Sequence, residues 1–317
     1  MKKMLMALSL SGALLGGSAV VWAEDAASAP VTAEQTVAVA DNGTTTEVIA
    51  VETPAPVEAA PAAEAVPTVD TGDTAWILVS TALVLLMTIP GLALFYGGMV
   101  RKKNVLSTMM FSLSAAILVS LIWVIVGYSL AFSGSGAYVG DLAKAMLNGV
   151  AFDALSGTIP ESLFVIFQMT FAIITVAIIS GSIADRMKYS AFMAFIAVWV
   201  ILVYAPITHW VWAADGWLFK AGALDFAGGT VVHINSGVAG LVAAYMLGKR
   251  TGLGRESMAP HNLTLTVVGA SLIWVGWFGF NGGSALGAGA RASMAILVTQ
   301  VAAAAAAFSW LVVERVV

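Results

Sequence analysis

The sequence contains no cysteine and very little charge. Without cysteine the chain forms no disulfide bond, no thiolate metal site and no thiol nucleophile, so an oxidising compartment is permitted. Only 10% of the 317 residues are Asp, Glu, Lys or Arg, whereas 60% are hydrophobic and the mean hydropathy is +0.93. A soluble domain needs a more polar surface than this composition supplies. The chain is therefore predicted to be an integral membrane protein.

Basic residues are missing from residues 24–73, which hold ten of the chain's 18 acidic residues. The same stretch is rich in Ala, Pro, Thr, Val and Glu, and its prolines interrupt any helical or strand period. Such a segment cannot bury enough apolar surface to fold. Residues 24–73 are therefore predicted to be a disordered acidic leader in the periplasm.

The first 23 residues have the pattern of an export signal. Lys2 and Lys3 precede an apolar run over residues 4–21, and Val21 and Ala23 stand at the −3 and −1 positions of a cleavage site. This pattern predicts a secretory signal peptide over residues 1–23 that is removed after Ala23. The alternative is an uncleaved first membrane span.

Long hydrophobic runs dominate the remainder of the chain. Each run is long enough for a helix to cross ~30 Å of hydrocarbon at 1.5 Å per residue. Residues 74–317 are therefore predicted to form an all-α, polytopic helical bundle with seven spans. The runs cover residues 74–98, 106–132, 161–183, 189–211, 229–248, 262–282 and 292–313.

The charged residues between these runs differ from one side to the other. Basic residues follow the first, third, fifth and seventh runs, whereas the intervening loops are mainly acidic. The positive-inside rule then predicts a multi-pass protein of the cell (inner) membrane. Its mature N-terminus would lie in the periplasm, and Val317 would lie on the cytoplasmic side.

Several of the predicted spans contain helix-breaking residues, at Pro90–Gly91, Pro206 and Gly228–Gly229. Irregular backbone survives in lipid only where protein or a cavity surrounds it. Glycines spaced four residues apart, suited to close helix packing, end the sixth run: Gly279, Gly283 and Gly287.

One histidine lies deep inside a predicted span, in the sequence DFAGGTVVHIN over residues 225–235. A continuous helix would place His233 about two turns, ~12 Å, beyond Asp225. An ionisable group in a span indicates a pathway or a proton relay, and the alternative is a hydrogen-bonded core histidine. His209 and His261 are expected to be solvated or interfacial. No metal site is predicted, because no other ligand residue has suitable spacing.

Other candidate residues have structural alternatives. Asp225 either caps the helix that follows it or attracts cations to an outer mouth. Phe167 and Phe171 are four residues apart and share a helix face, as do Phe280 and Ser284. Aromatic residues at such spacing are more often core or interface residues than ligand contacts. The same alternative applies to Trp212, at the end of the fourth run.

Taken together, five stretches resemble the ammonium transporter family of the bacterial type. The resemblance covers nearly all of the chain from about residue 74 onward, in family order. The stretches are TALVLLMTIPGLALFYGGMVRKKNVLS (residues 81–107), FQMTFAIITVAIISGSIADR (167–186), DFAGGTVVHIN (225–235), GKRTG with PHNL (248–252 and 260–263) and GWFGFNGGSA (276–285).

The resemblance implies a fold of about eleven spans, built from two inverted five-helix repeats and one further span. This sequence has seven predicted spans, so its second repeat is incomplete. The second pore histidine of the family lies in a span after the seventh. We therefore expect the sequence to be a piece of a longer gene product, or else a chain that cannot assemble a pore as given.

The resemblance also implies an outer site that recruits ammonium, or methylammonium as its analogue. Trp212, Phe171 and Ser284 would form this site, with Phe167 beside it. Phe171 and Phe280 would be stacked rings that close the pore below the site.

Two further roles follow from the same resemblance. His233 would be the first of a pair of imidazoles that line the pore and relay a proton, and Asp225 would be a carboxylate needed for transport. The family implies a homotrimer with one pore per subunit and a PII-type nitrogen regulator as a cytoplasmic partner. No cofactor and no nucleic-acid partner are implied.

The mechanism that these roles predict separates the ion from its conjugate base. A bare cation at the bilayer centre costs at least ~2.5–3.5 kcal/mol, and desolvation lowers the pKa of an ammonium-type cation. The aromatic site would bind ammonium by cation–π contact, ammonium would lose its proton, and ammonia would pass the apolar constriction.

Three other functions are alternatives to transport. An ammonium sensor would use the same fold with a C-terminal signalling domain after Val317. A generic ion channel would conduct potassium as well as methylammonium. An enzyme is not expected, because no nucleophile, base and orienting group fall together and no Gly-rich phosphate loop is present.

Overall fold

The computed structural model describes residues 68–317. The predicted signal peptide and residues 24–67 of the predicted leader lie outside the described residues. Residues 68–309 belong to one compact unit, and Trp310–Val317 is assigned to another. These last residues are helical, and the Trp310 indole N–H donates a hydrogen bond to Glu314 Oε1 (2.8 Å).

Seven helical segments are long and apolar enough to cross a membrane, which confirms the predicted number of spans. They cover Thr71–Met99, Lys102–Phe132, Glu161–Ile183, Tyr189–Lys220, Gly229–Leu247, Leu263–Gly282 and Ala290–Val316. The first begins three residues before the predicted boundary at residue 74. Asp70 caps it by accepting a hydrogen bond from Asp73 N (2.8 Å), so residues 71–73 are helical and the assignment of these residues to the leader was wrong.

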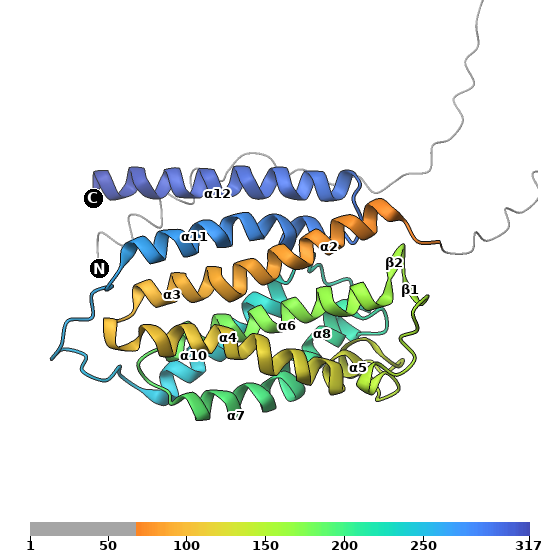
Figure 1. Ribbon diagram of the computed structural model, residues 1–317, viewed down its shortest axis with the longest axis horizontal. Coiled ribbons are helices and arrows are strands. Elements are labelled where there is room, and N and C mark those ends of the chain that lie inside the picture. Colours follow the sequence, from red (N-terminus) through yellow and green to blue (C-terminus); the bar gives the residue numbers. More distant parts are fainter. Residues whose placement is uncertain (1–67) are drawn as a thin grey trace, which may run out of the picture. The chain divides into compact units, whose positions relative to one another are not determined.

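Most spans consist of more than one helical element (Figure 1). The first comprises α2 (Thr71–Leu86), η1 (Met87–Leu92) and α3 (Ala93–Met99). The second comprises η2 (Lys102–Asn104), α4 (Val105–Ile122), η3 (Trp123–Gly127) and α5 (Tyr128–Phe132). The third is α6 (Glu161–Ile183), and the fourth comprises α7 (Tyr189–Trp199), η5 (Val200–Tyr204), α8 (Ala205–Trp212) and α9 (Trp217–Lys220).

The remaining spans are η6 (Gly229–Ile234) with α10 (Asn235–Leu247), α11 (Leu263–Trp277) with η7 (Phe278–Gly282), and α12 (Ala290–Val316). A short 3-10 turn, η4 (Ala145–Leu147), lies in the loop after α5. The same loop carries an antiparallel strand pair, β1 (Leu155–Ser156) and β2 (Ile159–Pro160), which the sequence analysis did not predict.

The predicted breaks are π-helical turns, in which the backbone bonds reach five residues rather than four. Pro90 lies inside η1, and Pro206 follows η5 directly after Ala205. Because proline has no N–H to donate, a wider turn beside it leaves fewer backbone groups without a partner. Gly228 has φ +114°, which strongly favours glycine, and it precedes the π turn η6.

The helix α6 lies at the centre of the core, and 72% of its most apolar stretch is buried. This helix packs against α2, α4 and α10, and Figure 1 shows it among them. Residues on one face, such as Ala172 and Val176, belong to the larger apolar cluster. Phe167, Phe171 and Ile174, on another face, belong to a second cluster that includes Phe280. The helix α6 therefore joins the general core to the cluster in which the candidate residues lie.

Glycines allow α11 and η7 to approach the first span closely. A Cβ atom added to Gly269 would overlap the backbone nitrogen of Phe95 and lie 2.6 Å from the carbonyl oxygen of Gly91. The predicted glycine stripe belongs to the same seam. Added Cβ atoms would lie 2.6 Å from Leu83 Cβ at Gly279, 2.6 Å from Ser80 Cβ at Gly283 and 3.1 Å from Asp73 Oδ1 at Gly287.

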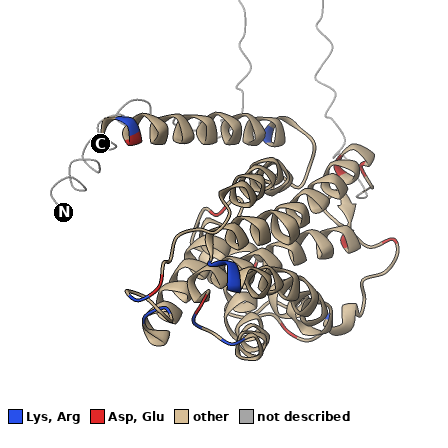
Figure 2. Cartoon of the chain, turned by 60° about the vertical axis from the view of Figure 1, so that its left-hand side comes forward, with Lys and Arg blue, Asp and Glu red and all other residues tan. Residues whose placement is uncertain are grey.

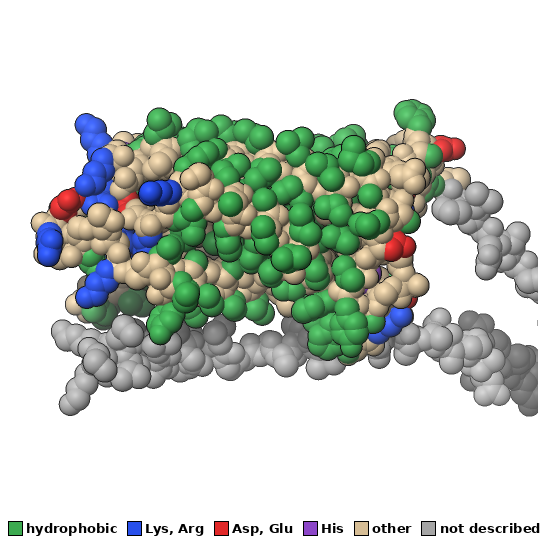
Figure 3. Space-filling view, turned by 90° about the horizontal axis from the view of Figure 1, so that it is seen from below, with side chains coloured by type: hydrophobic (Ala, Val, Ile, Leu, Met, Phe, Trp, Pro, Cys, Tyr) green, Lys and Arg blue, Asp and Glu red, His purple; other side chains and the backbone are tan. Residues whose placement is uncertain are grey.

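Charged residues lie mainly in the loops and near the ends of the helices (Figure 2). We call the end that carries the loops after α3, α6 and α10 the basic end, and the other the acidic end. Figure 3 shows an apolar band between a group of Lys and Arg side chains and the opposite end. The band is the surface that seven membrane-spanning helices require.

Ion pairs connect three loops at the basic end. Arg101, after α3, contacts Asp185 Oδ2 (3.2 Å), after α6, and Glu256 Oε2 (2.7 Å), in the loop between α10 and α11. Lys103 also pairs with Glu256 (2.8 Å), and Arg250 pairs with Asp185 (2.5 Å). The Asp185 side chain is fully buried, so two guanidinium groups compensate its charge away from water.

Replacing Gly269 by alanine is expected to separate α11 from the first span, because backbone atoms cannot move away as a flexible side chain can. We expect Gly269→Ala to lower the free energy of unfolding by at least ~2–3 kcal/mol. Denaturant unfolding of the purified protein in detergent measures it. Gly237→Ala is the matched control, since nothing lies within 4 Å of an added Cβ there. Equal stability of the two variants would contradict the close seam.

The ion pairs of Glu256 predict a dependence of stability on pH. The hydrogen bond and charge of Lys103, followed by those of Arg101, hold the pKa of Glu256 below its ordinary value. Their stabilisation is therefore present above the unfolded-state pKa of ~4.3 and is lost as the pH falls through the lower folded-state pKa.

We expect Glu256→Gln to lower the melting temperature at pH 7 and to flatten its decline between about pH 5 and pH 3. Asp153→Asn is the control, because Asp153 makes no ion pair with the described residues. A decline for Glu256→Gln as steep as that of the unmodified protein would assign the acid sensitivity to other groups.

Candidate functional site

Two phenylalanines on α6 form the inner wall of the candidate site. Phe167 and Phe171 are one helical turn apart, and their ring centroids are 5.0 Å apart at an interplanar angle of 75°. Each side chain is 1% exposed. The prediction that four-residue spacing places both rings on one face is confirmed.

Phe171 contacts rings from two other spans. The Trp212 indole, at the end of α8, lies 5.6 Å from Phe171 and perpendicular to it. The Phe280 ring, in η7, lies 4.6 Å away at 49°. Both phenylalanine rings are almost fully buried and in van der Waals contact, so no water-sized molecule fits between them. The rings are tilted and not stacked in parallel, which corrects the expected geometry.

Ser284 follows the π turn η7 and is half-buried. Its hydroxyl donates a hydrogen bond to the Phe280 carbonyl oxygen (2.7 Å). Because the proton of the hydroxyl is engaged, the oxygen retains lone pairs that can accept an N–H bond. Its neighbour Gly283 approaches Phe167, since an added Cβ would lie 2.9 Å from Cζ of that ring. The structure joins Ser284 to the aromatic group through these two residues.

Asp225 caps the first turn of η6, as the structural alternative predicted. Its carboxylate accepts hydrogen bonds from Gly228 N (2.6 Å), Thr230 N (2.9 Å) and Val231 N (2.9 Å). The positive end of the helix and three N–H donors stabilise the charged carboxylate. The backbone carbonyl of Asp225 also accepts the Trp212 indole N–H (2.9 Å). One residue therefore fixes both the start of η6 and the position of the indole.

The expected two helical turns between Asp225 and His233 are wrong, because the helix begins only at Gly229. His233 lies in the first turn, where its Nδ1 is 3.1 Å from the carbonyl oxygen of Gly228. A carbonyl only accepts hydrogen bonds, so Nδ1 carries the proton and neutral imidazole has its lone pair on Nε2. Among the described residues, none forms a hydrogen bond with Nε2.

His233 completes a continuous series of rings. Its imidazole lies 5.8 Å from Phe280 at 61° and 5.6 Å from Trp277 at 32°. Trp277 in turn lies 5.1 Å from Phe280 at 30°. The sequence analysis did not select Trp277, although the three-residue spacing from Phe280 within GWFGFN places the two rings on one side of the helix.

The other two histidines lie apart from this group. His209 is fully buried, and its ring nitrogens face the carbonyl oxygens of Ala131 and Gly136, so the expectation that it is solvated or interfacial was wrong. His261 Nδ1 lies 3.1 Å from the Val100 carbonyl oxygen at the basic end. The end of α5, at Ala131, and the loop after it, at Gly136, provide the contacts of His209, and a single sequence does not predict this pairing.

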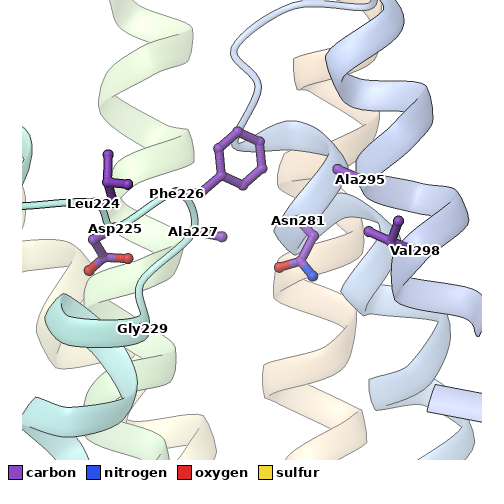
Figure 4. A pocket seen from close by; sticks show the side chains of 8 residues that line it. All are labelled: Leu224, Asp225, Phe226, Ala227, Gly229, Asn281, Ala295 and Val298. Atoms are coloured by element: carbon purple, nitrogen blue, oxygen red, sulfur yellow. The ribbon is translucent and has the colours of Figure 1, made fainter. Parts of the chain in front are cut away.

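A hollow of about 340 Å³ lies between the loop over residues 224–229 and the helical elements η7 and α12 (Figure 4). The picture shows the Asp225 carboxylate turned toward the turn at Gly229, while Asn281 and Val298 line the hollow from η7 and α12. Asn281 Nδ2 donates a hydrogen bond to Thr299 Oγ1 (2.9 Å). Asp225, whose carbonyl holds Trp212, also lines the hollow, whereas Trp212, Phe171, Phe280, Trp277 and His233 do not.

No three His, Cys, Asp or Glu residues between 68 and 317 are arranged to hold a metal ion. Aromatic rings, one hydroxyl, one imidazole and a capped carboxylate make up the site. Such a set can bind a small cation on ring faces and accept its N–H groups.

Residues 75–317 match the sequence profile of the Ammonium Transporter Family. The chain belongs to the ammonium transporter family. An ammonium transporter of Bacillus subtilis is 55% identical over 248 residues, which are 78% of this chain and 60% of that protein. An ammonium transporter of Mycobacterium tuberculosis is 49% identical over 276 residues, which are 78% of this chain and 57% of that protein.

Solved structures show the same fold. Candida albicans Mep2 is 37% identical with a TM-score of 0.72, and the match covers 78% of this chain and 55% of that one. A structure described as a sensor Amt protein is 33% identical with a TM-score of 0.70, covering 76% of this chain and 61% of that one. The fold is therefore the all-α membrane fold of the ammonium transporter family, and the chain spans less than two thirds of the length of these relatives.

Removal of the Asp225 carboxylate in this ammonium transporter family member is expected to loosen the start of η6. We expect Asp225→Ala to lower the free energy of unfolding by roughly 2 kcal/mol, because three N–H groups lose a charged acceptor. Asp215→Ala removes an exposed pair with Lys220 (2.8 Å) and should cost no more than ~1 kcal/mol. Unfolding in detergent compares them, and the opposite order would refute the capping role.

Proposed function

We propose that the protein is an ammonium uptake transporter that binds ammonium at the aromatic site and conducts ammonia past His233. The observation that carries this proposal is the continuous series of contacting rings from Trp212 through Phe171 and Phe280 to His233. The family and the names of the relatives support the substrate.

Recruitment would depend on what distinguishes ammonium from potassium. The two cations are similar in size and charge, and each gains ~0.5–2 kcal/mol from contact with an aromatic face. Only ammonium has N–H groups to donate, and the hydroxyl oxygen of Ser284 keeps acceptor capacity because its proton is bound to the Phe280 carbonyl. The half-buried Trp212, positioned by its bond to the Asp225 carbonyl, would provide the accessible face.

The Phe171–Phe280 contact would select the neutral molecule. No polar side chain replaces a hydration shell between two buried phenylalanine rings, so an ion is disfavoured there by several kcal/mol. Ammonia carries no net charge and passes when a ring turns aside. The proton must therefore leave ammonium at this contact, where the His233 imidazole, 5.8 Å from Phe280, would receive it.

His233 would accept a hydrogen bond or the proton itself beyond the rings. Its Nδ1 proton is directed to the Gly228 carbonyl, which leaves the Nε2 lone pair as the basic position. Asp225 would act mainly by holding this geometry, because its carboxylate is occupied by three backbone N–H groups.

Replacement of His233 tests the proposal directly. In proteoliposomes containing the protein from its full reading frame, His233→Ala should reduce the current after an ammonium jump at least about tenfold, as expected for a lost proton-transfer group. His261→Ala is the matched control, since His261 makes the same kind of Nδ1–carbonyl contact at the basic end.

Undiminished and ammonium-selective current through His233→Ala would argue against the relay. A potassium jump of equal size should produce no comparable current in the unmodified protein. If it does, the chain is a generic cation channel and the recruitment site fails with it.

The alternative function is ammonium sensing. It is favoured by the similarity to the sensor Amt protein, whose TM-score is close to that of the Mep2 structure. A kinase-like or cyclase-like domain after Val317 in the reading frame, together with absent ammonium current, would establish sensing. A short tail and a robust current would establish transport.

The membrane location, orientation and assembly of the protein are also proposals. The charge distribution favours a basic end in the cytoplasm and an acidic end in the periplasm of the cell inner membrane. A cleaved signal peptide over residues 1–23 agrees with that orientation. The homotrimer and the PII-type regulator rest on the family resemblance alone.

A further inference from the structure

The imidazole of His233 is restrained at two places. Its Nδ1 is hydrogen-bonded to the Gly228 carbonyl oxygen, which fixes one atom of the ring. Trp277, on α11, lies 5.6 Å away with its plane only 32° from the imidazole plane. Phe280 contacts the same imidazole edge-on at 61°. The hydrogen bond restrains the ring at one atom, and the flat indole contact restrains the orientation of the ring plane.

We propose that Trp277 is a positioning residue that sets the imidazole plane of His233 and stabilises its charged form during proton transfer. This inference rests on the proposed function, because it assigns to Trp277 a part in the proton step of that site. Trp277 is itself held by Phe280, 5.1 Å away at 30°, so the indole cannot turn without moving the ring that closes the passage. The closing ring Phe280 and the imidazole of His233 are thereby linked through one side chain.

Two physical effects support this role. A ring that turns about its side-chain torsion loses the Nδ1 bond to Gly228, and the indole face blocks that rotation. A cation beside an indole face is attracted by the negative quadrupole of the ring, most strongly for tryptophan. An imidazolium formed at His233 would receive that stabilisation in a site with little water.

Few other charges face His233. On its own side, Asp225 precedes η6, and its carboxylate is bonded to the first turn. The elements α11 and η7 contain no ionisable residue between 263 and 282. Glu161 stands at the distant first residue of α6 and pairs with Lys144. Within residues 68–317, the aromatic environment from Trp277 is therefore a principal influence on the charged imidazole.

The test measures ammonium-driven current against pH in proteoliposomes with the full-length protein. Trp277→Leu is expected to reduce the current roughly two- to thirtyfold, the range that a lost cation–π contact allows. It should also move the acid limb of the profile to lower pH by about 0.5–1 unit, because the charged imidazole loses stabilisation. Trp277→Phe keeps an aromatic face and should restore the current to within about threefold of the unmodified protein.

Trp274→Leu is the matched control on the same helix. The Trp274 indole N–H bonds to Gln300 Oε1 (2.9 Å) on α12 and is not among the rings around His233. This variant should leave the acid limb in place. A shift equal to that of Trp277→Leu would show a general effect of cavity formation in α11 and would overturn the inference.

A second measurement separates this inference from the proposed function. NMR titration of labelled histidine in nanodiscs follows the His233 imidazole whether or not current flows. A lower titration midpoint in Trp277→Leu supports the positioning role, and an unchanged midpoint with an unchanged acid limb overturns it. If His233→Ala retains selective current while Trp277→Leu still lowers the His233 midpoint, the proton relay is refuted and the positioning role of Trp277 is supported. Should Trp277→Leu fail to fold, Trp277→Met replaces it with the same two outcomes.

Discussion

The carboxylate of Asp225 is the group on which the geometry of the site depends. A span that begins at a left-handed glycine exposes backbone N–H groups, and in a membrane such groups need internal partners. Asp225 supplies them at Gly228, Thr230 and Val231, and its carbonyl holds the Trp212 indole. The Gly228 carbonyl then orients His233. A cap that satisfies the backbone thus also positions an aromatic face and an imidazole.

The π turns are subject to the same requirement that backbone N–H groups in a membrane have internal partners. Five of the seven spans in residues 68–317 contain one, and two of these turns, η6 and η7, carry His233 and Phe280. A π turn rotates the residues after it relative to a regular helix and directs side chains to positions that an α-helix does not reach. The glycine seam brings η7 close to the first span, since a Cβ added at Gly279 would lie 2.6 Å from Leu83 Cβ.

Hydropathy predicted the seven spans, proline and glycine predicted helix breaks near three of the five π turns, and four-residue spacing predicted the shared face of Phe167 and Phe171, because these depend on local sequence alone. The cap by Asp225 was an explicit alternative and is confirmed. Several features were missed or wrong: the helical residues 71–73, the strand pair β1 and β2, the tilt between Phe171 and Phe280, the helix start at Gly229, the burial of His209, and Trp277 beside His233. The burial of His209 and the contact of Trp277 with His233 join distant segments, such as His209 with Gly136, and no periodicity within one segment carries that information.

The contact between Phe171 and Phe280 has a consequence for throughput. Both rings are buried and in contact, so only carbon and hydrogen atoms meet at this point. If ammonia follows this route, each molecule crosses during a brief excursion of a ring in a crowded core, and molecules cross singly. The maximum rate of conduction is then set by protein motion. Tighter binding of ammonium at the aromatic site would raise the occupancy of that site without raising the rate of conduction.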